Sequence, residues 1–365
     1  MLQEIINKTL KNHFLGLMWC RISHRYAFLL KLKGHYKKIC MNNPKQHRIH
    51  SITRLLLLSV LNLIMLLTQT KANNAIAPLV ENPIEGRWDI TIDMGGRLLP
   101  SWLEVRHSGF RTLVGQFTGV SGSARPISRV NFAEGKINFS IPPQWDQGTN
   151  DQVFEATLQG DSLAGTMTAS DGKKFNWTAV RAPSLRRTQG PVWGKPVKLF
   201  NGTDLKGWHA LGNNQWIVTD GILKSPKSGA NIVTDDSFTD FKLHIEFRYP
   251  KESNSGVYLR GRYEVQIADS KGLEPLKDQL GAIYGFIAPS ENMAKAPGEW
   301  QAYDITLVGR MVTVVCNGTT IICNQEIPGI TGGALNSREG EPGPLMIQGD
   351  HGPVEFRNIV ITLAK

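Results

Sequence analysis

Residues 241–249, F-K-L-H-I-E-F-R-Y, alternate apolar and charged or polar side chains with a period of two. This is the pattern of a strand with one buried face, because successive strand side chains point to opposite faces of a sheet. Similar short runs recur between residues 83 and 364, and none of the windows in this region shows a sustained helical period. The sequence therefore predicts an all-β protein.

A stretch rich in Pro, Gly and Arg separates two strand-rich regions, and we expect a linker at residues 183–196. The region before it, residues 81–182, has short strands broken by Gly-Gly, Gly-Asp and Asp-Gly turns. This spacing favours a smaller antiparallel β-barrel or sandwich domain. For residues 197–365 the alternating runs predict two antiparallel sheets packed face to face.

The formal net charge of +10 is concentrated at the start of the chain. Residues 1–72 contain 12 of the 41 Lys and Arg residues but only one of the 31 acidic residues, Glu4. The rest of the chain carries 29 basic and 30 acidic residues. Because nucleic-acid binding requires a basic surface, we expect no nucleic-acid partner.

Residues 1–72 have the features of a leader. An apolar run at residues 55–67 follows Lys45, Arg48 and Arg54, and a short T-Q-T-K-A segment comes after it. This order predicts a secretory signal peptide, and the run is short for a membrane span. We expect residues 41–72 to be the signal, residues 1–40 to be a mis-assigned extension, and the mature protein to be periplasmic or extracellular without a stable membrane span. An uncleaved N-terminal anchor is the alternative.

The stretch of residues 254–270, N-S-G-V-Y-L-R-G-R-Y-E-V-Q-I-A-D-S, is expected to form two short strands around a turn near Gly261. Tyr258 and Arg260 then share one face of the first strand. Glu264 and Gln266 share a face of the second strand. Since the residues between them are apolar, the sequence predicts one core face and one face that combines a phenol, a guanidinium, a carboxylate and an amide.

Several motifs follow one another through residues 197–364. They are V-K-L-F-N-G-T-D-L-K-G-W (197–208), W-I-V-T-D-G-I-L (216–223), D-F-K-L-H-I-E-F-R (240–248), N-S-G-V-Y-L-R (254–260), Y-E-V-Q-I-A-D (263–269), G-A-I-Y (281–284), G-E-W-Q (298–301), C-N-G (316–318) and I-Q-G-D-H-G-P-V-E-F-R-N-I (347–359). In this order they resemble the 3-keto-disaccharide hydrolase family, whose fold is a concanavalin A-like β-sandwich, or jelly roll. Two departures are Gln301, where Asn is usual, and the Gly349-Asp350 pair before His351. The first domain more weakly resembles a β domain attached to some family members.

The resemblance implies cleavage of a 3-keto-glucoside or related disaccharide. A ketone at C3 acidifies the C2 proton, and the leaving group at C1 is β to that ketone. A base can therefore remove the C2 proton, a cation or donor can stabilise the enolate, and an acid can protonate the departing oxygen. Addition of water then gives the free 3-keto sugar.

The chemistry that the resemblance implies assigns roles to three residues. Glu264 is expected to be the general base or a metal ligand, Arg260 a fixed cation for the enolate, and His351 the acid or proton shuttle. The residues expected to bind the sugar are Glu246, Asn254, Tyr258, Gln266, Asp269, Tyr284 and Gln348. The alternatives are a surface ion pair between Glu264 and Arg260 and a turn-capping role for His351.

The need for a cofactor is left open by the sequence. A divalent ion, Ca²⁺ or Mn²⁺, would be held mainly by oxygen ligands such as Glu264 and Asp269. Two other functions remain possible. One is an ordinary two-carboxylate glycosidase using Glu264 and Asp269, although a five-residue offset puts them on opposite strand faces unless a bulge intervenes. The other is a non-catalytic, lectin-like carbohydrate-binding module.

Overall fold

The computed structural model describes residues 82–365, and the expected leader at residues 1–72 lies outside this range. Residues 82–365 belong to one compact unit. All the regular secondary structure of the described residues is β-strand, so the all-β prediction is confirmed. The described part of the chain contains no helix with the length and apolar character that a membrane crossing requires.

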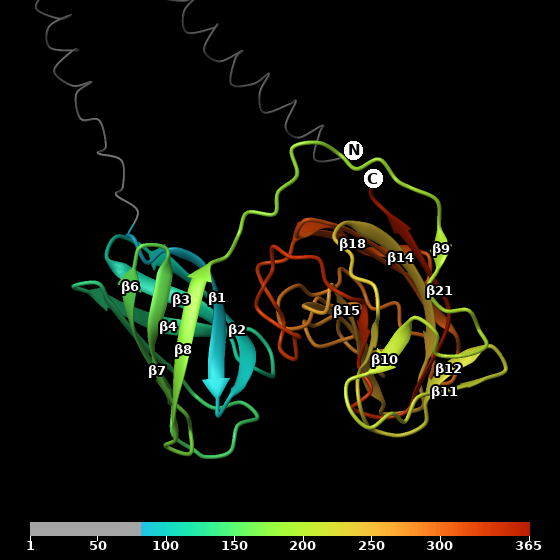
Figure 1. Ribbon diagram of the computed structural model, residues 1–365, viewed down its shortest axis with the longest axis horizontal. Helices are drawn as coiled ribbons and strands as arrows, with labels where there is room; N and C mark the ends of the chain where they lie inside the picture. Colours follow the sequence, from blue (N-terminus) through green and yellow to red (C-terminus); the bar gives the residue numbers. More distant parts are fainter. Residues whose placement is uncertain (1–81) are drawn as a thin grey trace, which may run out of the picture. The chain divides into compact units, whose positions relative to one another are not determined.

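The first domain is a closed antiparallel barrel (Figure 1). Its strands are β1 (Gly86–Met94), β2 (Arg97–Ser108), β3 (Thr112–Thr118), β4 (Arg125–Ala133), β5 (Lys136–Ile141), β6 (Gln152–Gln159), β7 (Ser162–Thr168) and β8 (Lys174–Arg181). Each strand pairs with the next, and β1 also pairs with β8, from Trp88 opposite Arg181 to Asp93 opposite Asn176. Of the two architectures expected for this region, the structure has the barrel.

Alternation along the barrel strands fills the interior with apolar side chains. In β5, Ile137, Phe139 and Ile141 are buried, whereas Lys136 and Ser140 are exposed. The ring of Phe139 stacks on that of Phe154 from β6, with centroids 4.8 Å apart and planes 4° from parallel. An eight-stranded barrel is narrow enough for side chains to fill, and stacked aromatic rings bury a large apolar area in it. The interior is therefore a packed core.

The second domain is the expected sandwich of two antiparallel sheets (Figure 1). One sheet has five strands in the order β10 (Trp208–Ala210), β13 (Ile232–Thr234), β20 (Met346–Ile347), β15 (Asn254–Leu259) and β16 (Tyr263–Ala268). The other has the order β11 (Ile217–Thr219), β12 (Ile222–Ser225), β21 (Val354–Leu363), β14 (Phe241–Arg248), β17 (Gln301–Val308), β18 (Met311–Cys316) and β19 (Thr319–Glu326), and β9 (Val197–Lys198) pairs with β21.

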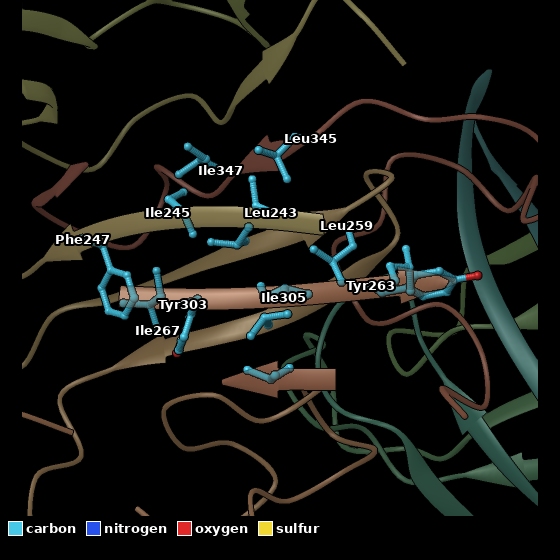
Figure 2. Close-up of a cluster of buried hydrophobic side chains, with 14 of the residues drawn as sticks. Leu243, Ile245, Phe247, Leu259, Tyr263, Ile267, Tyr303, Ile305, Leu345 and Ile347 are labelled. Atoms are coloured by element: carbon cyan, nitrogen blue, oxygen red, sulfur yellow. The ribbon is translucent and has the colours of Figure 1, made fainter. Parts of the chain in front are cut away.

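The core of this domain lies between the two sheets. Figure 2 shows side chains from both sheets, among them Leu243, Ile245 and Phe247 of β14 with Leu259 of β15 and Ile267 of β16. These residues are almost completely buried. Each such side chain stabilises the fold by roughly 1.5–3 kcal/mol relative to an exposed position. The odd positions of residues 241–249 therefore face the core as the alternation predicts.

The hairpin of β15 and β16 positions the polar residues of interest. Tyr258 pairs with Glu264, and Gly256 pairs with Gln266. Val257 and Val265, the neighbours of Tyr258 and Glu264 along their strands, belong to the core between the sheets. Since strand side chains alternate, Tyr258, Glu264 and Gln266 lie on the opposite, outer face of the five-stranded sheet.

Candidate functional site

A cavity of about 520 Å³ lies over this outer face. Its lining residues are Ser121, Gly122, Trp145, Asn254, Tyr258, Glu264, Gln266, Tyr284, Gly332, Gly333, Gln348, Asp350 and His351. The volume lies within the ~300–1,000 Å³ typical of small-molecule sites. Seven of the residues singled out in the sequence are therefore brought together around one cavity.

Glu264 is the buried carboxylate of the cavity. Its exposed fraction is 4%. Burial raises the pKa of Glu264 to about 8, partly offset by a hydrogen bond from Tyr258 and the charge of His351. Within residues 82–365, no Lys or Arg is among the charges that shift this pKa. Glu264 is thus a carboxyl group that can exchange a proton near neutral pH.

Tyr258 connects Glu264 to the backbone. Its hydroxyl lies 2.9 Å from Oε2 of Glu264 and 3.0 Å from the carbonyl oxygen of Gly332. A phenol has one proton to donate, so it can donate to only one of them at a time. When Glu264 is ionised, Tyr258 can donate to it. When Glu264 is protonated, Glu264 can donate to Tyr258, which then donates to Gly332. Both protonation states of the carboxyl are accommodated without a buried unpaired group.

Two glycines leave room for this pair. A β-carbon on Gly256 would lie 2.3 Å from Oε1 of Glu264, and one on Gly333 would lie 2.7 Å from the hydroxyl oxygen of Tyr258. Gly333 also has a φ of 77°, a conformation that glycine adopts at little cost. The carboxylate therefore leans across the bare backbone of β15, where any side chain would displace it.

His351 is a titratable group of the cavity, and its side chain is about half exposed. Its Nδ1 lies 2.6 Å from Oδ1 of Asp350. This contact raises the pKa of His351, burial opposes the shift, and the charges of Asp350 and Glu264 add to it. A protonated imidazolium is thereby favoured beside the cavity.

The remaining predicted residues of the cavity are hydrogen-bonding groups. Gln266 donates from Nε2 to the carbonyl of Asp278 at 3.3 Å. The side-chain carbonyl oxygens of Gln266 and Gln348 have no partner among the described residues. Burial, followed by the charge of Glu264, raises the pKa of Tyr284, which keeps its hydroxyl protonated. Together with Asn254, these groups offer acceptors and donors for sugar hydroxyls.

Arg260 does not lie in the cavity, contrary to the expectation from alternation. It follows the last residue of β15, and its φ of 53° places it in the left-handed region. The alternation of strand side chains therefore ends before Arg260, and its side chain points away from the cavity. Its Nη2 donates to the hydroxyl of Tyr263 at 2.9 Å and to the carbonyl of Gly309 at 3.0 Å. Arg260 is a buried structural residue and cannot serve as the expected cation for an enolate.

Glu246 and Asp269 also lie outside the cavity. Glu246 belongs to β14 of the other sheet, where Oε2 accepts a hydrogen bond from Arg357 at 2.6 Å. Asp269 follows the end of β16 and accepts a hydrogen bond from the backbone N–H of Glu252 at 2.9 Å. Both expectations are corrected: the first residue faces away on the second sheet, and the second fixes a turn.

The cavity also contains residues that the sequence did not single out. Ser121, Gly122 and Trp145 come from barrel loops, and the glycines 332 and 333 come from the segment after β19. Asp350 adds a second carboxylate. A lone tryptophan in the polar loop P-P-Q-W-D-Q-G was the one local signal that could have indicated a ligand contact.

The expected metal ligands are not gathered into a site. Within residues 82–365, no three His, Cys, Asp or Glu side chains form a group that could hold a metal ion. Glu264 lines the cavity, whereas Asp269 does not. The side chains therefore do not fit a preformed Ca²⁺ or Mn²⁺ centre, and a divalent ion stays a prediction for experiment.

Sequence and structural relatives of this chain are known. Residues 195–362 match the family model of the 3-keto-alpha-glucoside-1,2-lyase-like domain. A 3-keto-disaccharide hydrolase from Bacteroides thetaiotaomicron is 25% identical over 191 residues, which cover 40% of this chain and 65%, less than two thirds, of that relative. A solved structure of a candidate glycosyl hydrolase from Parabacteroides distasonis is 28% identical, with 50% of this chain and 96% of that chain covered and a TM-score of 0.39. A Bacillus licheniformis β-glucanase is 12% identical, with 49% and 100% covered and a TM-score of 0.30. The match of the family model confirms the resemblance, and residues 195–362 form a 3-keto-alpha-glucoside-1,2-lyase-like domain.

Proposed function

We propose that the protein cleaves the glycosidic bond of 3-keto-glucosides, with Glu264 as the general base. The observation that carries this proposal is a buried carboxyl that faces a cavity and has a pKa of about 8. A base works best when its pKa is near the working pH, and a pKa of 4.5 would give a much weaker base. The family of the domain supplies the class of substrate.

The proposed reaction begins with transfer of the C2 proton to Glu264. The C–H electron pair forms an enolate through C2, C3 and the C3 oxygen, and then expels the C1 substituent to leave a C1–C2 double bond. His351 gives a proton to the departing oxygen. Water then adds at C1 and gives one of its protons back to His351, and Glu264 returns a proton to C2, which yields the 3-keto sugar and the free alcohol.

The enolate oxygen requires a hydrogen-bond donor, and Arg260 lies elsewhere. Tyr284 is the donor that we propose, because it lines the cavity and its raised pKa keeps its proton. Tyr258 has a different role: its alternate donation to Glu264 or Gly332 permits the carboxyl to gain and lose a proton in a buried place. No step requires a metal ion.

Asp350 gives a specific reason to consider a second function. It lines the same cavity as Glu264, so the chain has two carboxylates at one site even though Asp269 is not one of them. An ordinary glycosidase using Glu264 and Asp350 would act on unoxidised disaccharides. Turnover of trehalose or lactose at the rate of their 3-keto forms would favour it.

The direct test is cleavage of 3-keto-trehalose by the mature chain in deuterated water, followed by NMR. We expect one deuterium at C2 of the released 3-keto sugar, because Glu264 exchanges its proton with solvent before returning it. Authentic product incubated without protein measures the spontaneous exchange. Product that carries no deuterium beyond this control would indicate direct hydrolysis. Failure to cleave, with and without Ca²⁺ or Mn²⁺, would refute the proposed function.

Chelation and location test two separate proposals. If a divalent ion bound by Glu264 is required, treatment with a chelator should abolish turnover, and Ca²⁺ or Mn²⁺ should restore it.

We also propose that the protein acts outside the cytoplasm, on the basis of the signal-like residues 41–72. The mature protein recovered from its host should then begin near residue 73.

A further inference from the structure

Part of the outer rim of the cavity comes from the barrel, which lies outside the family domain at residues 195–362. Ser121 and Gly122 come from the loop between β3 and β4, and Trp145 comes from the loop between β5 and β6. Barrel and sandwich belong to the same compact unit. The barrel therefore contributes directly to the surface that meets a ligand.

The first of these loops, residues 119–124, is fixed against the sandwich by backbone contacts. The N–H of Gly333 donates to the carbonyl of Val120 at 2.9 Å. A β-carbon on Gly332 would lie 2.2 Å from the carbonyl oxygen of Gly122, and one on Gly285 would lie 2.5 Å from the backbone nitrogen of Ala124. Such close approaches require glycine. The loop is thus held beside Tyr258 and Glu264 without intervening side chains.

The second loop presents Trp145 at the rim. Gln144, its neighbour in the chain, bonds Ser123 twice: Oε1 accepts from the backbone N–H at 3.1 Å, and Nε2 donates to the hydroxyl at 3.0 Å. A β-carbon on Gly122 would lie 3.1 Å from Cδ1 of Trp145, so the indole rests on the first loop. Nevertheless, 73% of Trp145 is exposed. The loop is anchored, but the aromatic side chain remains available to a ligand.

The exposed fraction of the side chains differs between the floor and the rim of the cavity. Glu264 and Gln266 on the floor are 4% and 3% exposed, whereas Trp145 is largely exposed. The sugar ring that reacts must reach Glu264 on the floor. A second ring attached through C1 would then extend toward the rim, where an aromatic surface can pack on the C–H groups of a pyranose.

We propose that Trp145, supported by residues 119–124, binds the leaving-group sugar of a 3-keto-disaccharide. This inference rests on the proposed function and adds a substrate preference: a second sugar ring at C1 is favoured over a small alkyl group. Trp145 is a specificity-determining residue, not a catalytic one, because it contacts the ring that departs and holds no reacting atom.

The test compares 3-keto-trehalose with methyl 3-keto-α-glucoside as substrates of the mature chain. Trp145→Ala should lower the ratio of their kcat/KM values by about fivefold to tenfold, and Trp145→Phe should restore most of the loss. Phe110→Ala is the matched control, because Phe110 is an equally exposed barrel aromatic, 76% exposed, that does not line the cavity. Its ratio should equal that of the wild type.

A ratio within twofold of wild type for Trp145→Ala, or an equal fall for Phe110→Ala, would overturn this proposal. If the wild type cleaves neither substrate, the proposed function fails. Binding of 3-keto-trehalose, measured by calorimetry, then tests the role of Trp145 separately. Weaker binding by Trp145→Ala, but not by Phe110→Ala, supports the second-ring site. Equal binding by all three proteins, or no binding by the wild type, refutes it.

Discussion

Two buried glutamates of the sandwich domain, Glu264 and Glu339, have similar hydrogen-bond partners but opposite electrostatic surroundings. Each accepts a hydrogen bond from a tyrosine of the β15–β16 hairpin: Tyr258 donates to Glu264 at 2.9 Å and Tyr263 donates to Glu339 at 2.7 Å. Burial raises the pKa of Glu264 to about 8. The pKa of Glu339 is lowered, because hydrogen bonds and the charge of Arg310 outweigh its burial.

The difference shows what separates a structural carboxylate from a reactive one. Arg310 bonds Glu339 through both Nε, at 3.1 Å, and Nη2. It compensates the buried charge and fixes the carboxylate in its ionised form. Glu264 faces a cavity and has no arginine bound to it, so ionisation of its carboxyl group costs free energy. Uptake of a proton from the substrate removes that cost. Asp89 of the barrel strand β1 also senses Glu339: burial and the charge of Glu339 raise the pKa of Asp89 to about 9.

Removal of the carboxylate on the cavity side should have the largest effect on activity. Glu264→Gln keeps the shape of the side chain but loses the base, so kcat should fall by roughly 10²–10⁴-fold. The free energy of unfolding at pH 8 should not decrease, because a buried charge is replaced by a neutral amide. Steady-state kinetics with 3-keto-trehalose and urea unfolding measure the two effects.

Glu246→Gln is the control for this substitution. Glu246 was expected to bind substrate, but its carboxylate pairs with Arg357 on the other sheet. Because exposed pairs contribute little, we expect less than a twofold change in kcat/KM and less than about 1 kcal/mol in stability. Equal losses of activity for the two variants would mean that Glu264 has no special role.

On the structural side of the comparison, Arg310→Met should lower the free energy of unfolding by about 3–5 kcal/mol. It leaves Glu339 buried without its cation, and the penalty of an uncompensated charge is large. Arg357→Met removes a partly exposed partner and should cost about 1 kcal/mol or less. Urea unfolding at pH 7 measures both. A similar cost for the two arginines would show that Glu339 is not held by the Arg310 charge.

Strand alternation predicted from the sequence which face of the hairpin carries Glu264. Tyr258, Glu264 and Gln266 lie on one face of the hairpin because the period of two holds throughout β15 and β16. The prediction for Arg260 is wrong because Arg260 itself adopts a left-handed backbone conformation, which ends the period of two. For Glu246, alternation gives the outward direction, but the outer faces of the two sheets point to opposite sides of a sandwich.

Strand alternation could not predict that loops of the barrel line the cavity. Ser121 approaches Glu264 because its loop, more than a hundred residues away in sequence, contacts glycines of the sandwich, and Trp145 does so because its loop packs on that first loop. A period of two says nothing about which loops meet. The fold class follows from patterning along single strands, whereas the rim of the cavity follows from contacts between domains.

Gly256→Ala tests whether the reactive carboxylate depends on the space above β15. The new β-carbon would lie 2.3 Å from Oε1 of Glu264, so the side chain must move. A displacement of about 1 Å at a catalytic group can reduce turnover by roughly 10²-fold, which is the expected loss in kcat. Gly190→Ala, at a glycine without neighbours within 4 Å, is the control. Unchanged kcat in Gly256→Ala would argue against the observed position of Glu264 as the productive one.

The smallest expected effect is a tenfold change of kcat/KM with pH. Of the two glutamates, only Glu264 should produce it. With a pKa of about 8, Glu264 is roughly one-tenth ionised at pH 7 and nine-tenths at pH 9. For 4-nitrophenyl 3-keto-glucoside, whose leaving group needs no acid, kcat/KM should therefore rise about tenfold between these pH values. With 3-keto-trehalose the profile should instead be bell-shaped, because His351 must stay protonated to assist departure.

The same ionisation has a thermodynamic consequence with a definite sign. Because folding raises the pKa of Glu264 from its usual 4.5 to about 8, the folded protein binds the extra proton, and its contribution to stability is lost as the pH rises through this range. Glu264→Gln cannot lose that proton, so its stability relative to wild type should increase between pH 5 and pH 8.5. Urea unfolding of both proteins at the two pH values measures the difference. A constant difference, together with a flat rate profile for the nitrophenyl substrate, would mean that Glu264 is as fully ionised at neutral pH as Glu339.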